Sequence, residues 1–419
     1  MADIQKLITE LCPDGVEFKK LGEIGTFVRG NGLQKKDFTE RGVGCIHYGQ
    51  IYTYYNLFTT ETKSFVDPDL AKKLTKVEPG NLIIACTSEN MEDVCKAVAW
   101  IGEVDIVTGG HACVFKHNEN PKYISYFFQT EDFNIQKKKY ARGAKVIDIK
   151  ASDLANIVIP VPPLAVQSEI VKYLDNFTEL TAELTAELTA RKKQYEYYRN
   201  KLLSFSDKTN RGGQIETKWM LISDVCSRIT DGSHSSPVAV EEGYYMPSVK
   251  DMTATCFDYS NCKKISKADY DSLVRNGCKP EIGDVLIAKD GSMLKYAFPV
   301  EKEEEVVILS SIAILRPIQE LVTSKYLAHY FRQESFKNIV IRDHSSKGGV
   351  PRIVLKNFKK IRIPIPPIEE QERIVDILDR FEKLTNDITE GLPAEIKARQ
   401  QQYEYYRNKL LTFKQKISA

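Results

Sequence analysis

The sequence predicts an α+β protein in which two mixed α/β globular domains lie at opposite ends of an antiparallel two-helix coiled coil. Three observations support this prediction. Residues 194–203 return letter for letter at 402–411, so the chain contains an internal repeat. Each repeated decapeptide ends a long stretch with apolar residues at mostly three- and four-residue spacing, which is typical of an amphipathic helix. Each such stretch follows a segment of short β-like runs. We expect a pseudo-twofold axis to relate the copies.

The composition is that of a globular protein with room for two or three domains in 419 residues. Charged residues make up 28% of the chain and hydrophobic residues 42%, which argues against intrinsic disorder. The net charge of +2 means that any surface for a polyanion must be local. The amino terminus does not resemble a signal peptide, no apolar run has the length of a membrane span, and the cysteines form no C-x-x-C pair. We expect a cytoplasmic protein with reduced thiols and no membrane partner.

The chain divides into five predicted segments. They are a helix (1–14), a first globular domain (15–158), a first helical segment (159–208), a second globular domain (209–362) and a second helical segment (363–419). In the first domain we expect strands at 24–28, 45–48, 81–86 and 97–104 and a helix at 123–130. In the opening helix Ile4, Leu7 and Ile8 share one face, which we expect to pack near the end of the second helical segment.

A proline motif, P-x-P-P, stands at the start of each helical segment, at 160–163 and 364–367. Because proline fixes φ and lacks an N–H group, we predict that neither strand nor helix continues there. The first segment then has no proline or glycine until about residue 205, which predicts one helix about 60 Å long. The second copy contains four extra residues. Gly391 suits the left-handed position after a helix and Pro393 the start of the next, so we predict a break there.

The two helical seams are most readily buried against each other. The predicted seam residues are Leu174, Phe177, Leu184, Leu188, Tyr195, Tyr198 and Leu202 in the first copy, and Leu378, Phe381, Ile388, Tyr403, Tyr406 and Leu410 in the second. Residues 181–188 repeat the tetrad T-A-E-L, whose period of four drifts by about 40° per unit around a helix, and we interpret this tetrad as a length adjuster.

The outward face of the decapeptide also repeats, which packing between the helices does not require. A partner that docks twice by the same face would explain it, whereas the alternative is a solvated helix surface. The predicted docking residues are Glu196, Arg199, Asn200, Glu404, Arg407 and Asn408.

The two domains, the P-x-P-P motifs and the helix ends Y-x-Y-Y-R-x-x-L-L together resemble the DNA-specificity subunits of type I restriction-modification systems. Each domain also carries the strand motif G-(N/D)-(L/V)-(I/L)-I-A, at 80–85 and 283–288. The chain departs from the family pattern at Ile46-His47-Tyr48, where Ile-Pro-Trp is common. The resemblance implies two target-recognition domains that read the halves of an asymmetric bipartite DNA sequence. It also implies helices that set the spacer and dock two methyltransferase subunits, and restriction and motor subunits through them.

Motifs of catalysis are absent from the sequence. A methyltransferase acting alone needs a glycine-rich cofactor loop and a (D/N)-P-P-(Y/F) tetrad, but residues 120–123 read N-P-K-Y and predict a turn before a helix. There is no G-x-x-x-x-G-K-(S/T) loop of an NTPase. His111 and His117 lack a third ligand at a workable spacing. We therefore expect no catalytic residue, no cofactor and no metal.

Two basic stretches, 136–150 and 337–362, occupy matched positions before the proline motifs. They predict phosphate contacts by Arg142, Lys145, Lys347 and Arg352, with a solvated surface as the alternative. Base edges would be read by loop residues with donors and acceptors. By position, the candidates are Tyr48, Gln50, Thr87 and Ser88 in the first domain, and Ser248, Lys250, Lys289 and Ser292 in the second. The alternative for the Ser and Thr residues is that they satisfy turns.

These patterns predict a non-catalytic, sequence-specific subunit that binds double-stranded DNA within a methyltransferase and restriction complex. The alternative is a coiled-coil scaffold that assembles proteins without reading DNA. Selection from a pool of random duplexes distinguishes the two, because only a reader of DNA enriches a split motif.

Overall fold

The computed structural model describes residues 2–205, 217–292, 294–344, 352–387 and 390–416. The chain forms two compact units. The first consists of Met1–Thr185 with Glu395–Ala419, and the second of Ala186–Ala394. Each unit therefore combines one globular domain with parts of both helical segments. No helix within the described residues is long and apolar enough to cross a membrane.

The first unit is built from many short strands and few helices. Its strands are β1 (Glu17–Lys20), β2 (Gly25–Arg29), β3 (Val43–Ile46), β4 (Phe58–Thr59), β5 (Ser64–Val66), β6 (Thr75–Val77), β7 (Leu82–Ala85), β8 (Thr87–Ser88), β9 (Ala97–Trp100), β10 (Ile106–Thr108), β11 (Ala112–His117), β12 (Ile147–Asp148) and β13 (Val158–Val161). Its helices are α1 (Ala2–Leu11), α2 (Leu21–Ile24), a 3-10 turn (Lys35–Asp37), α3 (Tyr48–Thr53), α4 (Pro68–Ala71), α5 (Pro121–Phe127), α6 (Glu131–Lys138), α7 (Ala151–Leu154) and the beginning of α8 (Leu164–Leu202).

A five-stranded sheet in the order β2-β11-β7-β9-β4 forms the centre of the first domain. Alternate residues of β7 enter two different cores. Leu82 and Ile84 face a cluster with the aromatic residues of α5, and Ile83 and Ala85 face a cluster with Ile46. Because both faces of the sheet are covered, β7 reads as a continuous apolar run. A four-stranded sheet, β5-β3-β10-β6, lies beyond the second core.

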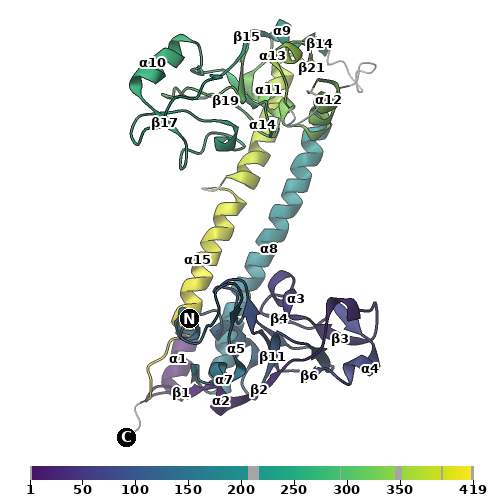
Figure 1. Cartoon of the computed structure of the whole chain (residues 1–419), viewed down its shortest axis with the longest axis vertical. Coiled ribbons are helices and arrows are strands. Elements are labelled where there is room, and N and C mark those ends of the chain that lie inside the picture. Colours follow the sequence, from purple (N-terminus) through teal and green to yellow (C-terminus); the bar gives the residue numbers. More distant parts are fainter. Residues whose placement is uncertain (1, 206–216, 293, 345–351, 388–389, 417–419) are drawn as a thin grey trace. The chain divides into compact units, whose positions relative to one another are not determined.

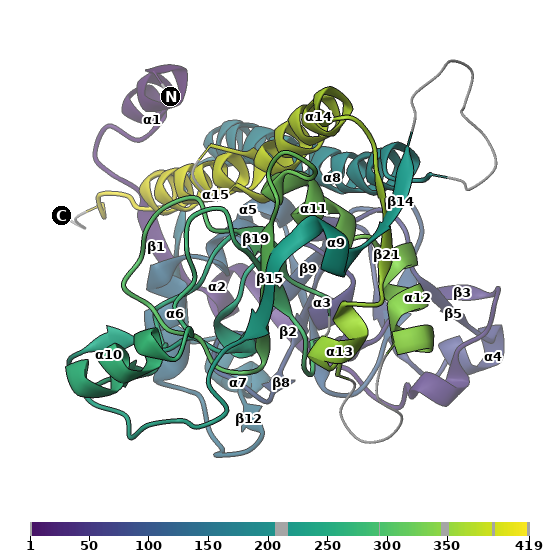
Figure 2. The ribbon, with the colours of Figure 1, turned by 90° about the horizontal axis from the view of Figure 1, so that it is seen from above.

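The second unit repeats the central sheet with fewer strands. Its elements are β14 (Lys218–Leu221), α9 (Ile222–Val225), β15 (Cys226–Asp231), β16 (Tyr244–Tyr245), a 3-10 turn (Val249–Asp251), β17 (Lys264–Ile265), α10 (Lys267–Arg275), β18 (Val285–Ala288), β19 (Ala297–Pro299), β20 (Ile312–Pro317), α11 (Ser324–Phe331), α12 (Glu334–His344), α13 (Leu355–Phe358), β21 (Arg362–Ile365) and α14 (Ile368–Asn386). The order β15-β20-β18-β19 matches β2-β11-β7-β9 of the first unit. Figure 2 shows α11 beside α14, with which it shares a core.

The expected elements of the first domain are found with small changes of boundary. The four strands predicted from the sequence overlap β2, β3, β7 and β9, and the predicted helix overlaps α5. The second of these strands ends earlier than expected, because α3 begins at Tyr48. Asn120 caps α5 with its side-chain oxygen, which accepts from the N–H groups of Lys122 and Tyr123, so the N-P-K-Y sequence is a helix start.

The proline motifs lie partly inside strands, and the expectation that no strand continues there was wrong. Pro160 stands in β13 opposite Phe18 of β1, and Pro364 stands in β21 opposite Trp219 of β14. Both sheets have only two strands. A proline is tolerated in such an edge strand, where its missing N–H need not enter a ladder.

A buried glutamine joins each proline motif to its globular domain. Gln167 is fully buried, and its Nε2 donates to the carbonyl of Pro162 at 2.8 Å. Its Oε1 accepts from the backbone N–H of Asn120 at 3.0 Å. Gln371 is equally buried and makes the equivalent pair of contacts at 2.9 Å each. In both units, the glutamine of the motif P-x-P-P-x-x-x-Q thus anchors the start of the long helix to the globular domain by hydrogen bonds.

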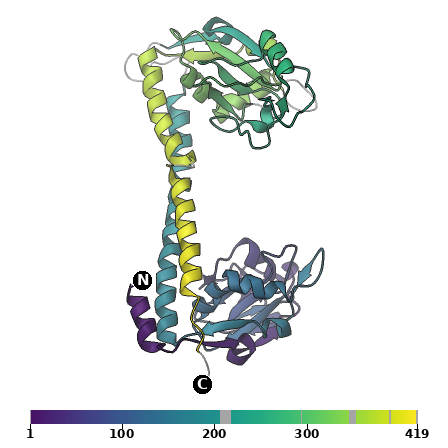
Figure 3. The same cartoon turned by 90° about the vertical axis from the view of Figure 1, so that its left-hand side faces the viewer.

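In the first unit the beginning of α8 packs on the end of α15 (Leu392–Leu410). Tyr173 and Phe177 lie 5.7 and 5.5 Å from the ring of Tyr406. Helix α1 joins the same cluster through the buried Ile4. Figures 1 and 3 show α1 at the C-terminal end of α15, alongside the first turns of α8.

In the second unit the end of α8 packs on α14. The ring of Phe381 lies 6.2 Å from Tyr195 and 5.6 Å from Tyr198. The start of one helical segment thus meets the end of the other in both units, which is the predicted antiparallel order.

The predicted break in the second helical segment is confirmed, although its physical reason differs. Helix α14 ends at Asn386 and α15 begins at Leu392. Gly391 is not among the residues with positive φ. A Cβ atom there would lie 2.6 Å from the carbonyl oxygen of Lys383 and 2.7 Å from that of Asp387. Glycine is needed for this close approach and not for a left-handed turn.

Candidate nucleic-acid interface

Three chain segments meet on one surface of the first unit. The start of α3 contributes Tyr48 and the end of β7 leads into β8, which carries Thr87 and Ser88. Strand β8 pairs with β12, so that Ser88 stands opposite Ile147. The structure therefore places two predicted base readers beside the loop that carries Arg142 and Lys145. We call this set, with His111 described below, the first reading surface, after the role that the sequence predicts for it.

The basic loop of the first reading surface is a tight hairpin. Arg142 and Asp148 form a β-bridge at its base. Gly143 has φ +103°, and a Cβ atom there would lie 2.0 Å from the carbonyl oxygen of Val146. Arg142 forms a 3.2 Å ion pair with Asp153 and is exposed, and the exposed Lys145 makes no ion pair with the described residues. Two positive charges therefore face solvent at this hairpin.

Not all of the basic stretch 136–150 is available to a polyanion. The ammonium group of Lys137 is buried and donates to the carbonyls of Glu92 and Val94 at 3.0 and 2.9 Å. Burial lowers the pKa of Lys137. Sequence reasoning did not separate this structural lysine from its exposed neighbours, because the burial comes from distant segments.

His111 completes the first reading surface and was considered from sequence only as a metal ligand. Its ring lies 5.0 Å from the ring of Tyr48, and its Nδ1 lies 3.2 Å from Oγ1 of Thr87. The hydroxyl of Tyr52 donates to the carbonyl of Thr87 at 2.5 Å. The signal in the sequence is the position of His111 after Gly109 and Gly110 and directly before a buried strand.

Gln50 has a structural role that the sequence analysis did not assign. Its Oε1 accepts from the backbone N–H of His47 at 3.0 Å, which caps α3. Its Nε2 donates to Oγ of Ser64 at 2.7 Å. Both ends of the amide are engaged, so reading a base would require Gln50 to give up these bonds.

The second unit brings the equivalent segments together. The backbone of Asp290 bridges Arg352, and the N–H of Ile353 donates to the carbonyl of Lys289 at 3.0 Å. The N–H of Lys289 donates to the carbonyl of Ser311 at 3.0 Å, as that of Cys86 does to His111 at 2.8 Å in the first unit.

The remaining candidates of the second unit surround this frame. Oγ of Ser311 accepts from the N–H of Val249 at 3.1 Å, which brings the turn with Ser248 and Lys250 to the same place. We call the set Ser248, Lys250, Lys289, Ser292 and Arg352 the second reading surface. Lys347 lies outside the described residues.

Lys289, a predicted base reader, is not a free cation. Its side chain is only 7% exposed and pairs with Asp290 at 3.1 Å and Asp231 at 3.4 Å. By contrast, Lys250, Ser292 and Arg352 are exposed, and Ser248 is half-buried with its hydroxyl donating to Asp251 at 2.9 Å. The second reading surface thus consists of the buried Lys289, paired with two carboxylates, and of exposed polar residues around it.

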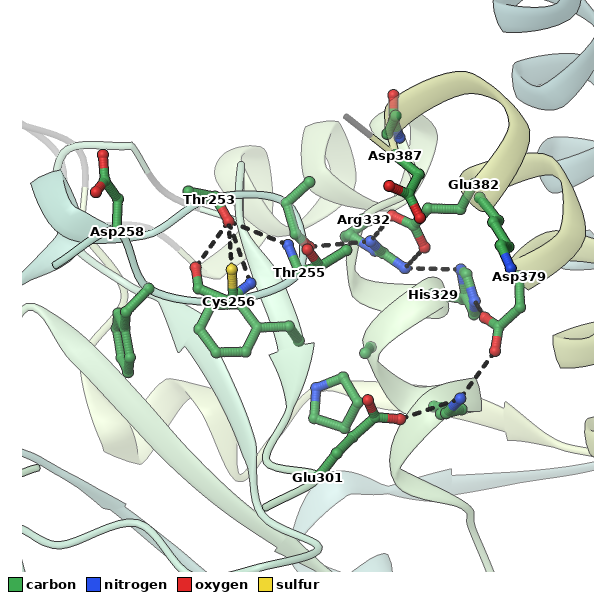
Figure 4. Close-up of a pocket in the computed structure, with 18 residues that line it drawn as sticks. Thr253, Thr255, Cys256, Asp258, Glu301, His329, Arg332, Asp379, Glu382 and Asp387 are labelled. Atoms are coloured by element: carbon green, nitrogen blue, oxygen red, sulfur yellow. Dashed lines mark hydrogen bonds and ion pairs between the residues drawn. The ribbon is translucent and has the colours of Figure 1, made fainter. Parts of the chain in front are cut away.

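A separate polar cluster lines a cavity of about 890 Å³ in the second unit (Figure 4). His329, Asp379 and Glu382 are close enough to hold a metal ion. Nε2 of His329 lies 2.7 Å from Asp379, and the guanidinium of Arg332 donates to Nδ1 of His329 and to Glu382 at 2.9 Å each. Because arginine only donates, Nε2 carries the proton that Asp379 accepts. Every ligand atom already has a protein partner, and the cluster is best described as structural.

The predicted seam and docking residues lie on different parts of the helices. In the seam, Leu174, Leu184, Tyr195, Leu378 and Leu410 are buried, Phe177, Leu188, Tyr198, Leu202, Phe381, Tyr403 and Tyr406 are half-buried, and Ile388 lies outside the described residues. In the docking set, Glu196, Asn200 and Glu404 are exposed, and Arg199, Arg407 and Asn408 are half-buried. The guanidinium groups of Arg199 and Arg407 lie over the rings of Tyr195 and Tyr403, at 5.2 and 5.4 Å.

Sequence reasoning missed the most exposed aromatic residues of the decapeptide. Tyr197 is 59% exposed and Tyr405 is 58% exposed, at equivalent positions of the two copies. The ammonium groups of Lys201 and Lys409 lie over their rings, at 5.7 and 5.5 Å. The signal in the sequence was a tyrosine that repeats outside the seam.

A family model, the type I restriction modification DNA specificity domain, matches residues 13–191 and 254–398. A putative type I restriction enzyme specificity subunit of Haemophilus influenzae is 35% identical over 72% of this chain and 75% of its own length. The EcoR124I/EcoR124II specificity subunit of Escherichia coli is 36% identical over 70% of each chain.

Solved structures agree in fold. The S subunit of a type I system from M. genitalium matches with a TM-score of 0.53 at 13% identity and covers 95% of this chain and 96% of its own. A chain from a structural study of complex assembly in the type I system matches with a TM-score of 0.57 at 17% identity, covering 95% and 97%. The predicted fold class, mixed α/β domains with an internal repeat and antiparallel helices, is confirmed. The chain belongs to the DNA-specificity subunits of type I restriction-modification systems.

Proposed function

We propose that this specificity subunit is non-catalytic and directs a methyltransferase and restriction complex to an asymmetric bipartite DNA target, one half of which is read by each globular domain. The observation that carries the proposal is the repeated frame of the reading surfaces. In both units the same backbone bonds join the end of the central strand, the start of its neighbour and the basic loop. The side chains on this frame differ, so the two half-sites should differ.

The first reading surface has separate groups for the two kinds of DNA contact, namely cations for phosphates and hydroxyl groups for base edges. Arg142 and Lys145 project positive charge from the tight hairpin and can neutralise phosphates. Tyr48, Thr87 and Ser88 lie beside that hairpin and offer hydroxyl groups to base edges. In this arrangement phosphate contacts position the domain and the central residues specify the sequence.

The second reading surface offers a more charged set. Arg352, with Lys347, would contact phosphates, and the exposed Lys250 and Ser292 would read base edges. The compensated ion network of Lys289 would orient its neighbours and would read a base only after rearranging its ion pairs.

Helix α8 would act as the ruler between the half-sites. The T-A-E-L tetrads lie in its middle, and the hydroxyls of Thr181 and Thr185 donate to the carbonyls one turn earlier at 2.8 and 2.7 Å. Adding one tetrad would lengthen the helix by about 6 Å without adding a proline or glycine. We expect a wider spacer with unchanged half-sites.

The partners of the helices would be two copies of one methyltransferase subunit, with restriction and motor subunits recruited through them. The same exposed pair in the two decapeptides, Tyr197 with Lys201 and Tyr405 with Lys409, supports this stoichiometry, since one partner surface can bind both. A complex that saturates at a single methyltransferase per specificity subunit would contradict it.

The experiment is a selection from random duplexes with the specificity subunit assembled with its methyltransferase. Methylated sequences are recovered and sequenced, and a split motif with two unlike halves is expected. A complex that assembles and enriches no motif would favour the scaffold alternative.

A further inference from the structure

Three non-glycine residues in the described part of the chain have a left-handed backbone. They are Cys95 at φ +67°, His111 at +65° and Leu294 at +54°. Cys95 and Leu294 are equivalent, because their N–H groups donate to the carbonyls of Ala85 and Ala288, at 2.9 and 2.8 Å. Both are buried, so their strain belongs to the repeated frame. His111 has no left-handed counterpart, since Ser311 occupies its place in the second unit.

The left-handed backbone of His111 is imposed by packed surroundings. Its carbonyl accepts from Cys86 at 2.8 Å. Two residues earlier, Gly109 approaches so closely that a Cβ atom there would lie 2.2 Å from Cβ of Leu33. Such a conformation is unfavourable for a side chain larger than glycine and persists where it presents a functional group. Burial does not explain it here, because the side chain is exposed.

The imidazole of His111 is held with one nitrogen toward the protein. Nδ1 faces Oγ1 of Thr87 at 3.2 Å, and the ring rests against Tyr48. When the hydroxyl of Thr87 donates to Nδ1, Nε2 carries the proton. Nε2 has no hydrogen-bond partner among the described residues and so offers one N–H donor at the centre of the first reading surface.

We propose that His111 is a specificity-determining residue that donates from Nε2 to an acceptor on a base edge in the half-site read by the first unit. In the major groove such acceptors are N7 and O6 of guanine, N7 of adenine and O4 of thymine. This inference rests on the proposed function. The equivalent position of the second unit differs, because Ser311 has no left-handed backbone and its hydroxyl accepts from the N–H of Val249 inside the domain.

The test replaces His111 by glycine in the specificity subunit assembled with its methyltransferase. Because φ +65° suits glycine, the His111→Gly variant should fold at least as stably as the wild type. Sequencing of methylated sites from random duplexes should show discrimination reduced about tenfold at one base pair of the first half, with the second half unchanged. His111→Asn, whose side chain also tolerates a left-handed backbone, should change the preferred base at that position.

The matched control is Asn118→Gly, which places a glycine at an exposed position just beyond the other end of β11 and should leave the motif unchanged. A His111→Gly complex that retains the full wild-type motif overturns the inference while leaving the proposed function intact. A wild-type complex that enriches no motif overturns the proposed function itself, and the inference with it.

Discussion

The junction between globular domain and long helix is built twice on one backbone frame with different polar side chains. In the first unit Asp175 of α8 accepts from the hydroxyl of Tyr126 at 2.6 Å and pairs with Lys122 at 2.7 Å. In the second unit Asp379 of α14 binds His329 at 2.7 Å and Lys325 at 3.0 Å. One carboxylate and one lysine are kept, whereas a tyrosine is exchanged for a histidine.

One turn farther along the long helices the junctions diverge more. The first unit has Thr178, and Gln129 accepts from the hydroxyl of Tyr403 at 2.8 Å. The second has Glu382, paired with Arg332. Neutral hydrogen bonds in one copy are thus replaced by a charged pair in the other. The backbone frame and the buried glutamines therefore carry the common architecture, whereas the polar side chains at each junction have changed together.

The largest expected effect comes from breaking the charged junction on one side. Glu382→Leu leaves the guanidinium of Arg332, whose side chain is only 10% exposed, without its carboxylate. We expect the free energy of unfolding of the second unit to fall by about 3–5 kcal/mol. Hydrogen exchange of peptides from α11 and α14 measures it.

The matched control is Thr178→Val at the equivalent position of the first unit. Thr178 donates to the carbonyl of Leu174 within its own helix and lies 3.3 Å from the hydroxyl of Tyr126, which keeps its bond to Asp175. The change should therefore cost less than about 1 kcal/mol. Equal losses in the two variants would show that the junctions do not differ as described.

The second prediction concerns the buried glutamine that both junctions share. Gln167→Leu and Gln371→Leu each leave a buried N–H and a buried carbonyl unsatisfied, so each should destabilise its own unit by about 2–3 kcal/mol. Hydrogen exchange at α5 and α11 should report similar losses. The exposed Gln401→Leu serves as control and should change neither. A loss confined to one unit would contradict a common frame.

The third prediction uses pH. Burial lowers the pKa of His329 from its ordinary value of 6.5. Below pH 6.5 the unfolded chain therefore takes up a proton that the folded unit does not bind, and the free energy of unfolding falls as the pH falls. His329→Tyr introduces the residue of the first junction, so a smaller decrease between pH 7.5 and pH 5.5 is expected in urea denaturation.

A comparison with the wild type is needed for that measurement, because burial also lowers the pKa of His117 in the first unit, to about 4. The difference between the two proteins isolates His329. An identical pH dependence of the variant and the wild type would refute the assignment.

The smallest effect is expected where the two copies are identical. Tyr197→Ala and Tyr405→Ala should each weaken binding of one methyltransferase subunit, by about tenfold, because each removes an exposed aromatic contact. Titration calorimetry would show one weakened site of two in either variant. The exposed Lys192→Ala is the control. Strongly unequal effects of the two tyrosines would show that the repeated faces bind unlike partners.

Features that repeat within the chain were predictable from sequence. The decapeptide, the proline motifs and the matched strand motif predicted two copies, continuous α8 and the break before α15. The same repetition could not reveal that Pro160 and Pro364 lie in edge strands, because that depends on pairing with β1 and β14 from distant parts of the chain. Local rules describe proline correctly but do not identify its neighbours.

The sequence located the loops that form the candidate site, but it did not show which partners their side chains bind. Matched offsets located the loops of Thr87, Lys289 and Arg352, and the structure brings them into two surfaces. The partners of each side chain come from elsewhere, such as Asp231 for Lys289 and Ser64 for Gln50. His111 was missed as a candidate because its distinguishing feature is a left-handed backbone angle, which no residue pattern displays directly.

The polar junction also sets where one globular domain could be exchanged for another. Arg332 and His329 belong to the second globular domain, but their carboxylate partners, Asp379 and Glu382, lie on the long helix. A chimaera cut at the proline motif would place Arg332 against Thr178 and leave its charge buried and unpaired. A transplant should therefore carry about four turns of helix beyond the prolines, through Glu382, and we expect only such chimaeras to assemble a stable recombinant subunit with a new pair of half-sites.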